Sequence, residues 1–353
     1  MNLIKEKVCS FEELYKAMHQ CKKDVLWKDS VAGYVKNGLV NCYTLSGQLM
    51  DGTYKIDGYS YFTIHEPKTR EIVSTRMKDR VFQRSLCDNY LYREMTKGLI
   101  YDNVACQRGK GTLFAMNRLN CHLQRYYREH GLNGYVLQCD IKNYFGSTRH
   151  DVAMDVVKKR VKNKWALGQV NEIICSFGTD DNPNMGMGLG SQVTQLIQLA
   201  VLDDMDHYIK EELKIKQYIR YMDDFILIHP DKEYLKYCRI EIEKKLEKIH
   251  LQVNKKKTQI YPITRGVKFL GFRFILTNKG KVIRKLNKDN ISKERRKLCR
   301  QKDLALEGVL TKDIVDKCYT SWKAHAKKGN THNLLKRMDC YYENLWKEEK
   351  KDV

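Results

Sequence analysis

The chain of 353 residues carries 65 Lys and Arg against 43 Asp and Glu, a formal net charge of +22. This length exceeds one typical hydrophobic core and predicts two or three packed lobes, and 42% hydrophobic residues exclude a disordered tail. The excess of cations favours a polyanionic partner, with nucleic acid ahead of an anionic membrane surface. With no apolar run long enough to span a bilayer and no lipidation motif, we expect no membrane partner.

The 12 cysteines are scattered singly, without a Cys-x-x-Cys pair. That distribution argues against a zinc ribbon and against a disulfide scaffold. It is typical of small buried thiols in a reducing compartment. We therefore expect a cytoplasmic protein.

The first elements along the chain are expected to be helices over residues 11–38, where charged and apolar residues mix at helical spacing. Residues 43–64 then favour short strands around two turn signals, Asp51-Gly52 and Asp57-Gly58.

A basic turn at residues 107–111 leads into a helix expected from Thr112 to about His130. The short apolar run 135–139 predicts a buried strand that ends in Asp140. The pattern next predicts a long helix, a strand–turn–strand, an amphipathic helix and a single strand, over residues 191–209, 221–228, 234–249 and 269–275. From residue 290 onward it is helical and basic, with Thr311 as an N-cap.

The sharpest motif is Tyr221-Met222-Asp223-Asp224, which lies between two apolar runs. Adjacent carboxylates in such a hairpin need compensation, because burying like charges is costly unless a cation or a metal pairs with them. A surface turn is the alternative interpretation of the Asp-Asp pair.

A further carboxylate, Asp140, follows the predicted strand 135–139, a position where a turn or cap residue is the ordinary interpretation. Two-metal phosphoryl transfer needs carboxylates from separate strands to converge on two divalent ions about 3.5–4 Å apart. Asp140 together with Asp223 and Asp224 supplies the residues for such a site.

Five segments occur in the order and spacing of the palm motifs of reverse transcriptases. They are residues 140–145, 188–195, 221–224, 254–258 and 267–272. The last segment resembles the primer-grip hairpin, with Phe269, Leu270 and Gly271 at its centre. The chain therefore resembles a reverse transcriptase over nearly all of its length from about residue 70.

The finer resemblance is to reverse transcriptases of diversity-generating retroelements, which have a group II intron-like palm. The segment that begins Leu189-Gly190 ends in Thr194-Gln195, where group II intron and retron enzymes end in Ser-Pro. Thr194 departs from the Ser of the retroelement enzymes but keeps the hydroxyl. Segments 105–112 and 321–331 are also similar to that group, although Gln107 stands where an Arg is expected.

The resemblance implies an RNA-directed DNA polymerase with a right-hand α+β fold. Its expected lobes are an N-terminal extension with fingers (1–134), a palm of antiparallel sheet plus helices (135–280) and a helical thumb (281–353). No maturase, endonuclease or RNase H segment is expected after the thumb.

The resemblance also implies roles for individual residues. The expected catalytic residues are Asp140, Asp223, Asp224 and Lys257, with Lys257 as the general acid for pyrophosphate release. The expected ligands of two Mg²⁺ ions, for which Mn²⁺ can substitute, are Asp140, Ile141, Asp223 and Asp224. The expected nucleotide-binding residues are Arg76, Arg108, Lys110, Phe145 and Gln192.

Phe145 lies five residues after Asp140 and resembles the steric gate that blocks a ribose 2′-hydroxyl; an ordinary core Phe is the alternative. For Arg76, Arg108 and Lys110, the alternative interpretation is an ordinary solvated charge. For Gln192, it is a polar helix cap. The basic stretch 293–302 is either a solvated helix or part of a thumb that tracks the product backbone.

The implied partners are a template RNA, the RNA/DNA duplex, deoxynucleoside triphosphates and a small basic accessory protein. The main alternative is a phage-defence or unclassified bacterial reverse transcriptase. An RNA-dependent RNA polymerase is disfavoured by Phe145 and by Tyr221-Met222. A catalytically silent RNA-binding scaffold is disfavoured by the presence of all three carboxylates.

Overall fold

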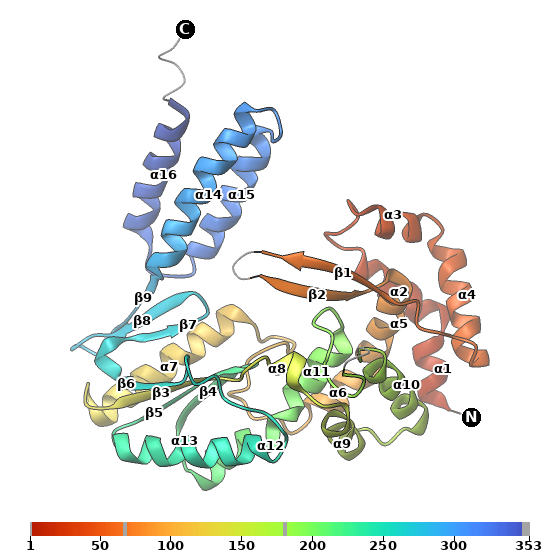
Figure 1. Cartoon of the computed structure of the whole chain (residues 1–353), viewed down its shortest axis with the longest axis horizontal. Coiled ribbons are helices and arrows are strands. Elements are labelled where there is room, and N and C mark those ends of the chain that lie inside the picture. The colour runs from red at the N-terminus through yellow and green to blue at the C-terminus, as the bar shows by residue number, and fades with distance from the viewer. Residues whose placement is uncertain (1, 66–68, 179–181, 348–353) are drawn as a thin grey trace.

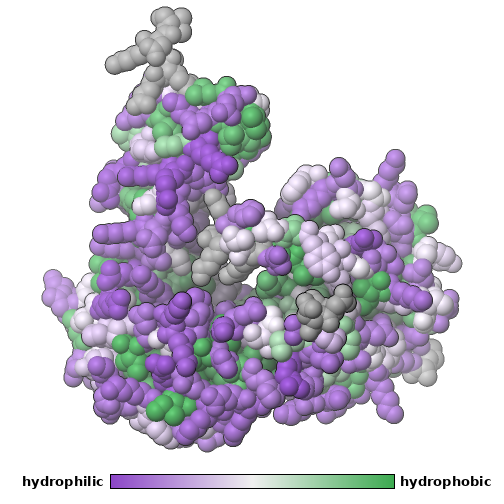
Figure 2. Space-filling view, viewed as in Figure 1, coloured by the Kyte–Doolittle hydropathy of each residue, from purple (hydrophilic) through white to green (hydrophobic). Residues whose placement is uncertain are grey.

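The structure, a computed structural model, describes residues 2–65, 69–178 and 182–347. In this part of the chain, helices surround three antiparallel sheets, so the mixed α+β class is confirmed (Figure 1). N-terminal and C-terminal helices lie on opposite sides of the sheets, and the surface is hollowed between them (Figure 2). No helix within the described ranges combines the length and the apolar composition needed to cross a membrane.

The N-terminal third is a helical body with a protruding hairpin. Its helices are α1 (Leu3–Cys9), α2 (Phe11–Cys21), α3 (Asp29–Lys36), α4 (Gly38–Asp51), α5 (Met77–Leu86), the π-helical turn η1 (Cys87–Leu91) and α6 (Tyr92–Thr96). The hairpin consists of β1 (Tyr59–Ile64) and β2 (Arg70–Thr75), and it points toward the C-terminal helices (Figure 1). Helix α2 packs on α4 and α5 within this body.

The prediction of strands over residues 43–64 is wrong for residues 43–51, because α4 extends to Asp51. Cys42, Leu45 and Leu49 are buried at helical spacing, which the strand interpretation overlooked. Gly52 adopts φ +75° and ends the helix, and its N–H donates to the Gln48 carbonyl. Asp51-Gly52 is therefore a helix end and not a hairpin turn.

The central sheet has the strand order β4–β5–β3–β6. Its strands are β3 (Tyr135–Asp140), β4 (Gln217–Tyr221), β5 (Asp224–His229) and β6 (Gln259–Pro262). Alternate residues of β3 pack into different cores: Leu137 joins the core shared with the N-terminal body, and Val136 joins the core shared with the long helix α7 (Thr112–His130). The predictions of the α7 helix and of the buried strand ending in Asp140 are confirmed.

Several helices connect the strands of the central sheet. They are α8 (Tyr144–Ser147), α9 (His150–Arg160), α10 (Lys164–Cys175), α11 (Gln192–Val201), α12 (Asp203–His207), the π-helical turn η2 (Tyr208–Glu212) and α13 (Lys232–Glu247). The single helix expected over residues 191–209 is broken at Leu202, where the backbone leaves helical geometry. The break allows Asp203 to pair with Arg160 and Asp206 to pair with Arg220.

The C-terminal part contains a small sheet followed by three helices. These elements are the 3₁₀ turn η3 (Ile263–Arg265), β7 (Val267–Phe269), β8 (Phe272–Leu276), β9 (Val282–Leu286), α14 (Lys288–Leu306), α15 (Lys312–Ala326) and α16 (His332–Lys347). The single strand expected over 269–275 is wrong, because Leu270 and Gly271 have φ values of +47° and +85° and turn the chain between β7 and β8. The N-cap at Thr311 is confirmed, since its Oγ1 accepts from the Ile314 N–H at 3.4 Å.

A fully buried ion pair lies beneath the β4–β5 hairpin. Arg220 donates to both carboxylate oxygens of Asp206, at 2.8 and 2.6 Å, and to the Leu199 carbonyl at 2.9 Å. Arg220 also donates to the Met222 carbonyl at 3.1 Å. One side chain therefore connects β4, α11, α12 and the turn after Tyr221.

We predict that Arg220→Met lowers the free energy of unfolding by about 3–5 kcal/mol, because it leaves the Asp206 carboxylate buried without its cation. The matched control is Arg239→Met, which removes a half-exposed pair with Glu243 and should cost less than about 1 kcal/mol. Denaturant unfolding of both variants measures the difference. Equal losses would contradict the role assigned to the buried pair.

Candidate active site

Two carboxylates face each other across the central sheet. Asp140, the last residue of β3, is the register partner of Asp224, the first residue of β5. Asp223 lies in the connecting turn, and its carbonyl accepts from the Ile141 N–H at 3.2 Å. The structure thus brings together the three Asp residues and Ile141, as the sequence motifs predict.

The turn that carries Asp223 is strained and supported from below. The β4–β5 connection has two residues, and such tight hairpins require positive φ. Met222 adopts φ +56°, a conformation unfavourable by about 1–2 kcal/mol for a residue with a side chain. The bond from Arg220 to the Met222 carbonyl holds this turn in place.

The electrostatic environment disfavours a full set of negative charges. The pKa of Asp224 is raised to about 7, chiefly by burial and also by the Asp223 and Asp140 carboxylates, although a hydrogen bond from Gln138 and the charge of Lys257 act in the opposite direction. A cation between Asp140 and Asp224 would favour the ionised form of Asp224 by direct attraction.

Lys257 supplies one such cation. Its Nζ lies 2.5 Å from both carboxylate oxygens of Asp140. The backbone delivers it there, because the Asn254 N–H donates to the Asp140 carbonyl at 2.6 Å and the chain turns back at residues 254–258. The predicted motif at 254–258 therefore lies beside the predicted catalytic carboxylate.

The donor chemistry fits Mg²⁺, which prefers carboxylate and carbonyl oxygens. Within the described ranges, however, no three Asp, Glu, His or Cys side chains converge closely enough to hold one ion. In this conformation the ammonium of Lys257 is paired with the carboxylate of Asp140. A metal ion that binds Asp140 must therefore share this carboxylate with Lys257 or displace the ammonium.

Phe145 and Gln192 lie on segments that contact each other. The Phe145 carbonyl accepts from the Met187 N–H at 2.8 Å, just before the loop that leads to α11. Gln192 is the first residue of α11, behind the N-cap Ser191. Both side chains are half-buried, and the Phe145 ring lies edge-on to Tyr144 at 5.8 Å.

The three predicted basic residues differ in their surroundings. Arg76 is exposed at the start of α5. Arg108 pairs with Asp88 at 3.1 Å and stacks over Tyr92. Lys110 donates to the carbonyls of Tyr101 and Asn103, and burial lowers its pKa. Arg108 and Lys110 must therefore give up these partners before they can bind a ligand, whereas Arg76 is exposed to solvent.

The predicted primer grip meets both the carboxylate turn and the C-terminal helices. The Phe269 ring lies edge-on to Tyr221, with centroids 6.4 Å apart. The Gly271 carbonyl accepts from the Asn287 N–H at 3.2 Å and from the Asn290 side chain at 3.4 Å. A Cβ at Gly271 would lie 3.3 Å from Asn290 Nδ2 and 3.4 Å from His325 Nε2.

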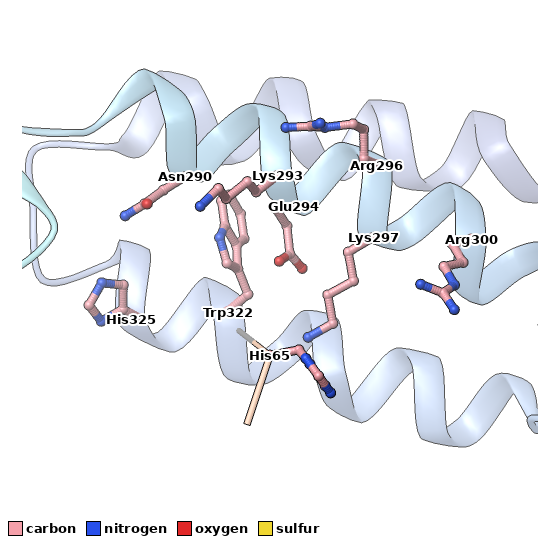
Figure 3. A pocket seen from close by; sticks show the side chains of 9 residues that line it. All are labelled: His65, Asn290, Lys293, Glu294, Arg296, Lys297, Arg300, Trp322 and His325. Atoms are coloured by element: carbon pink, nitrogen blue, oxygen red, sulfur yellow. The ribbon is translucent and has the colours of Figure 1, made fainter. Parts of the chain in front are cut away.

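A basic cavity of about 650 Å³ lies between His65, which follows β1, and helices α14 and α15. Figure 3 shows Lys293, Lys297 and Arg300 along α14, Trp322 and His325 on α15, and His65 opposite them. This cationic wall fits a polyanion, as the basic pattern of residues 293–302 predicts.

The sequence reasoning missed two polar residues of the site, Gln138 and Arg220. Gln138 stands two residues before Asp140 on β3, so strand alternation places it on the same face of the sheet as Asp140. Arg220 directly precedes the Tyr221 motif in a run of buried residues. A charged residue inside an apolar strand was the available signal.

We predict that Gly271→Ala destabilises the protein more than Gly58→Ala does. Both glycines have positive φ, +85° and +91°, so both substitutions carry the backbone penalty of about 1 kcal/mol. Only Gly271 is packed, whereas nothing lies within 4 Å of a Cβ at Gly58. The free energies of unfolding test this, and equal losses would show that the contact of Gly271 with Asn290 and His325 is not tight.

A known family matches the part of the chain that contains the three carboxylates. Residues 66–274 match the family described as reverse transcriptase (RNA-dependent DNA polymerase). Among curated proteins, none matches the chain.

Solved structures similar to this chain include two yeast telomerases. The telomerase of Candida albicans in complex with a TWJ fragment of telomeric RNA is 14% identical, with a TM-score of 0.49 over 83% of this chain and 55% of that chain. The apo telomerase of Candida tropicalis truncated from its C-terminal domain is 12% identical, with a TM-score of 0.46 over 62% of this chain and 53% of that chain. This chain spans about half the length of those structures. Because the family match covers more than half of the sequence, this chain belongs to the reverse transcriptase (RNA-dependent DNA polymerase) family.

Proposed function

We propose that this RNA-directed DNA polymerase copies a template RNA into cDNA by two-metal nucleotidyl transfer, as the enzyme of a diversity-generating retroelement. The observation that carries the catalytic part is the pairing of Asp140 with Asp224 across β3 and β5, with Asp223 in the turn between β4 and β5. This register places carboxylates from separate strands side by side, which supports the convergence that two-metal transfer requires.

In the proposed mechanism, the carboxylates of Asp140, Asp223 and Asp224 and the carbonyl of Ile141 hold two Mg²⁺ ions, with Mn²⁺ able to replace them. When bound, the ions activate the primer 3′-hydroxyl and neutralise the leaving pyrophosphate. Lys257 releases Asp140 and donates a proton to the pyrophosphate.

Other residues of the chain position the substrate. Arg76, Arg108 and Lys110 donate to triphosphate or template oxygens, which requires Arg108 and Lys110 to exchange their present partners. Phe145 lies beneath the sugar of the incoming nucleotide, and Gln192 lines the templating base pair. Phe269, Leu270 and Gly271 support the end of the primer.

The proposed lobes are the N-terminal extension with fingers (1–134), the palm (135–280) and the helical thumb (281–353). The cavity between the β1–β2 hairpin and α14 supports a path for the RNA/DNA duplex between fingers and thumb, because its wall is rich in Lys and Arg. A small basic accessory protein is the further partner that we propose.

The retroelement assignment rests on the segment before and within α11. There Gln195 donates to the Leu189 carbonyl at 3.1 Å, and the Thr194 hydroxyl donates to the Gly188 carbonyl. A Pro in place of Gln195 would lose the side-chain bond. A template-repeat and variable-repeat pair that differs at template adenines, in the DNA flanking the gene, tests this assignment. Without such a pair, the phage-defence or unclassified bacterial alternative holds.

We predict that Asp223→Asn and Asp140→Asn each reduce primer extension by at least about a thousandfold, equivalent to about 4 kcal/mol. The reason is the loss of a negatively charged ligand at the reaction centre. Extension on an RNA template with deoxynucleotides and Mg²⁺ measures the effect, and RNA binding should change little. Asp204→Asn, an exposed carboxylate on α12, is the matched control that retains full activity. Normal extension by either active-site variant rejects the catalytic assignment.

We predict that Phe145→Ala raises the ratio of ribonucleotide to deoxynucleotide kcat/KM by tenfold or more, since each ~1.4 kcal/mol of lost clash is a factor of ten. A Phe that serves only in packing would instead lower stability by about 3–5 kcal/mol and reduce both activities together. Phe114→Ala, another half-buried Phe, on α7, is the control that should leave the ratio unchanged. An unchanged ratio in folded Phe145→Ala would reject the gate.

A further inference from the structure

The carboxamide of Gln138 lies between the carboxylate pair and the primer-grip hairpin. Its Nε2 donates to the Lys268 carbonyl on β7 at 2.8 Å and to Asp224 Oδ1 at 3.3 Å. Its Oε1 accepts from the Tyr261 hydroxyl on β6 at 3.0 Å. One side chain on β3 thus contacts three other strands.

The partners fix the orientation of this amide. Both Nε2 hydrogens point to acceptors, a backbone carbonyl and a carboxylate, whereas Oε1 meets a phenol that donates. Rotating the amide by 180° would place its oxygen against two other oxygens. The Tyr261 side chain is almost fully buried and anchors the arrangement from the sheet edge.

The hairpin of β7 and β8 contacts the carboxylate turn at a second point, next to the first. Lys268, whose carbonyl accepts from Gln138, directly precedes Phe269, whose ring lies edge-on to Tyr221. Tyr221 begins the turn that carries Asp223, and Asp224 follows it. The hairpin is therefore connected to Asp224 through Gln138 and to the turn through Tyr221.

We propose that Gln138 is a positioning residue that couples the seating of a primer strand on the β7–β8 hairpin to the affinity of Asp224 for a divalent cation. This proposal rests on the proposed function, because it takes Asp224 as a metal ligand and the hairpin as the primer support. When the hairpin is seated, the Gln138 amide holds the Asp224 carboxylate toward Asp140. When the hairpin moves away, Asp224 loses this constraint and the cation binds more weakly.

Coupling between two binding events is reciprocal, so the cation must tighten the primer by the same factor by which the primer tightens the cation. Coupling of this kind commonly amounts to about 5–150-fold in affinity. Tyr261 contributes by holding the amide oxygen, and its own removal should weaken the coupling in the same direction.

The test uses the full chain, Mn²⁺ as the probe and a primer–template duplex with a 3′-dideoxy end, without nucleotide. Electron paramagnetic resonance of free Mn²⁺ gives the Kd of Mn²⁺ with and without the duplex, and Asp223→Asn serves to subtract binding outside the carboxylate site. For the wild type, we expect the duplex to lower the Kd of carboxylate-dependent Mn²⁺ binding by at least about fivefold. For Gln138→Leu, we expect the Kd without duplex to stay within about twofold and the duplex effect to disappear.

The matched control is Gln259→Leu, the same substitution at the exposed register partner of Gln138 on β6, which should keep the wild-type coupling. Tyr261→Phe keeps the ring and should reduce the coupling, and it decides the question if Gln138→Leu fails to fold.

Wild-type coupling in both Gln138→Leu and Tyr261→Phe would overturn the proposal while leaving the metal site intact. If Asp223→Asn binds Mn²⁺ like the wild type, the proposed metal site itself fails.

Discussion

The antiparallel pairing of β3 with β5 sets Asp140 directly opposite Asp224, and the other features of the site follow from it. Like charges on directly opposed residues weaken a sheet, and here they also lie in partly buried surroundings. A fold built for stability alone would place apolar or opposite-charge residues there. The register therefore imposes an electrostatic cost that cations must offset.

One cation of the chain meets this demand directly, and a second supports the backbone of the neighbouring turn. Lys257 reaches Asp140 from the segment after α13, and the buried Arg220 supports the strained turn at Met222 while it is itself neutralised by Asp206. The Lys257 pair is half-exposed and exchangeable, whereas the Arg220 pair is fully buried and permanent. Lys257 is therefore suited to be displaced by the proposed metal ion, and Arg220 is suited to hold the backbone of the turn.

The C-terminal helices are also held to the site by a few specific contacts. The C-terminal helices are attached to the site through Gly271, whose carbonyl accepts two bonds from the start of α14 and whose missing side chain allows the close approach. The β1–β2 hairpin projects from the N-terminal body toward the same helices (Figure 1), and a basic cavity lies where His65 approaches α14 and α15.

The sequence by itself determined the buried strand before Asp140, the α7 helix and the family, and it singled out the three carboxylates that the structure brings together, because these depend on local patterns and ordered motifs. It misassigned α4 and the strand at 269–275, since Asp-Gly and Leu-Gly serve equally as helix ends and as turns, and only packing and φ decide between them. The contacts of Gln138 and Arg220 did not follow from the sequence either, although their positions on the strands offered a signal. Their partners, Lys268 and Asp206, lie on other elements, and only the tertiary structure brings these donors and acceptors within hydrogen-bond distance.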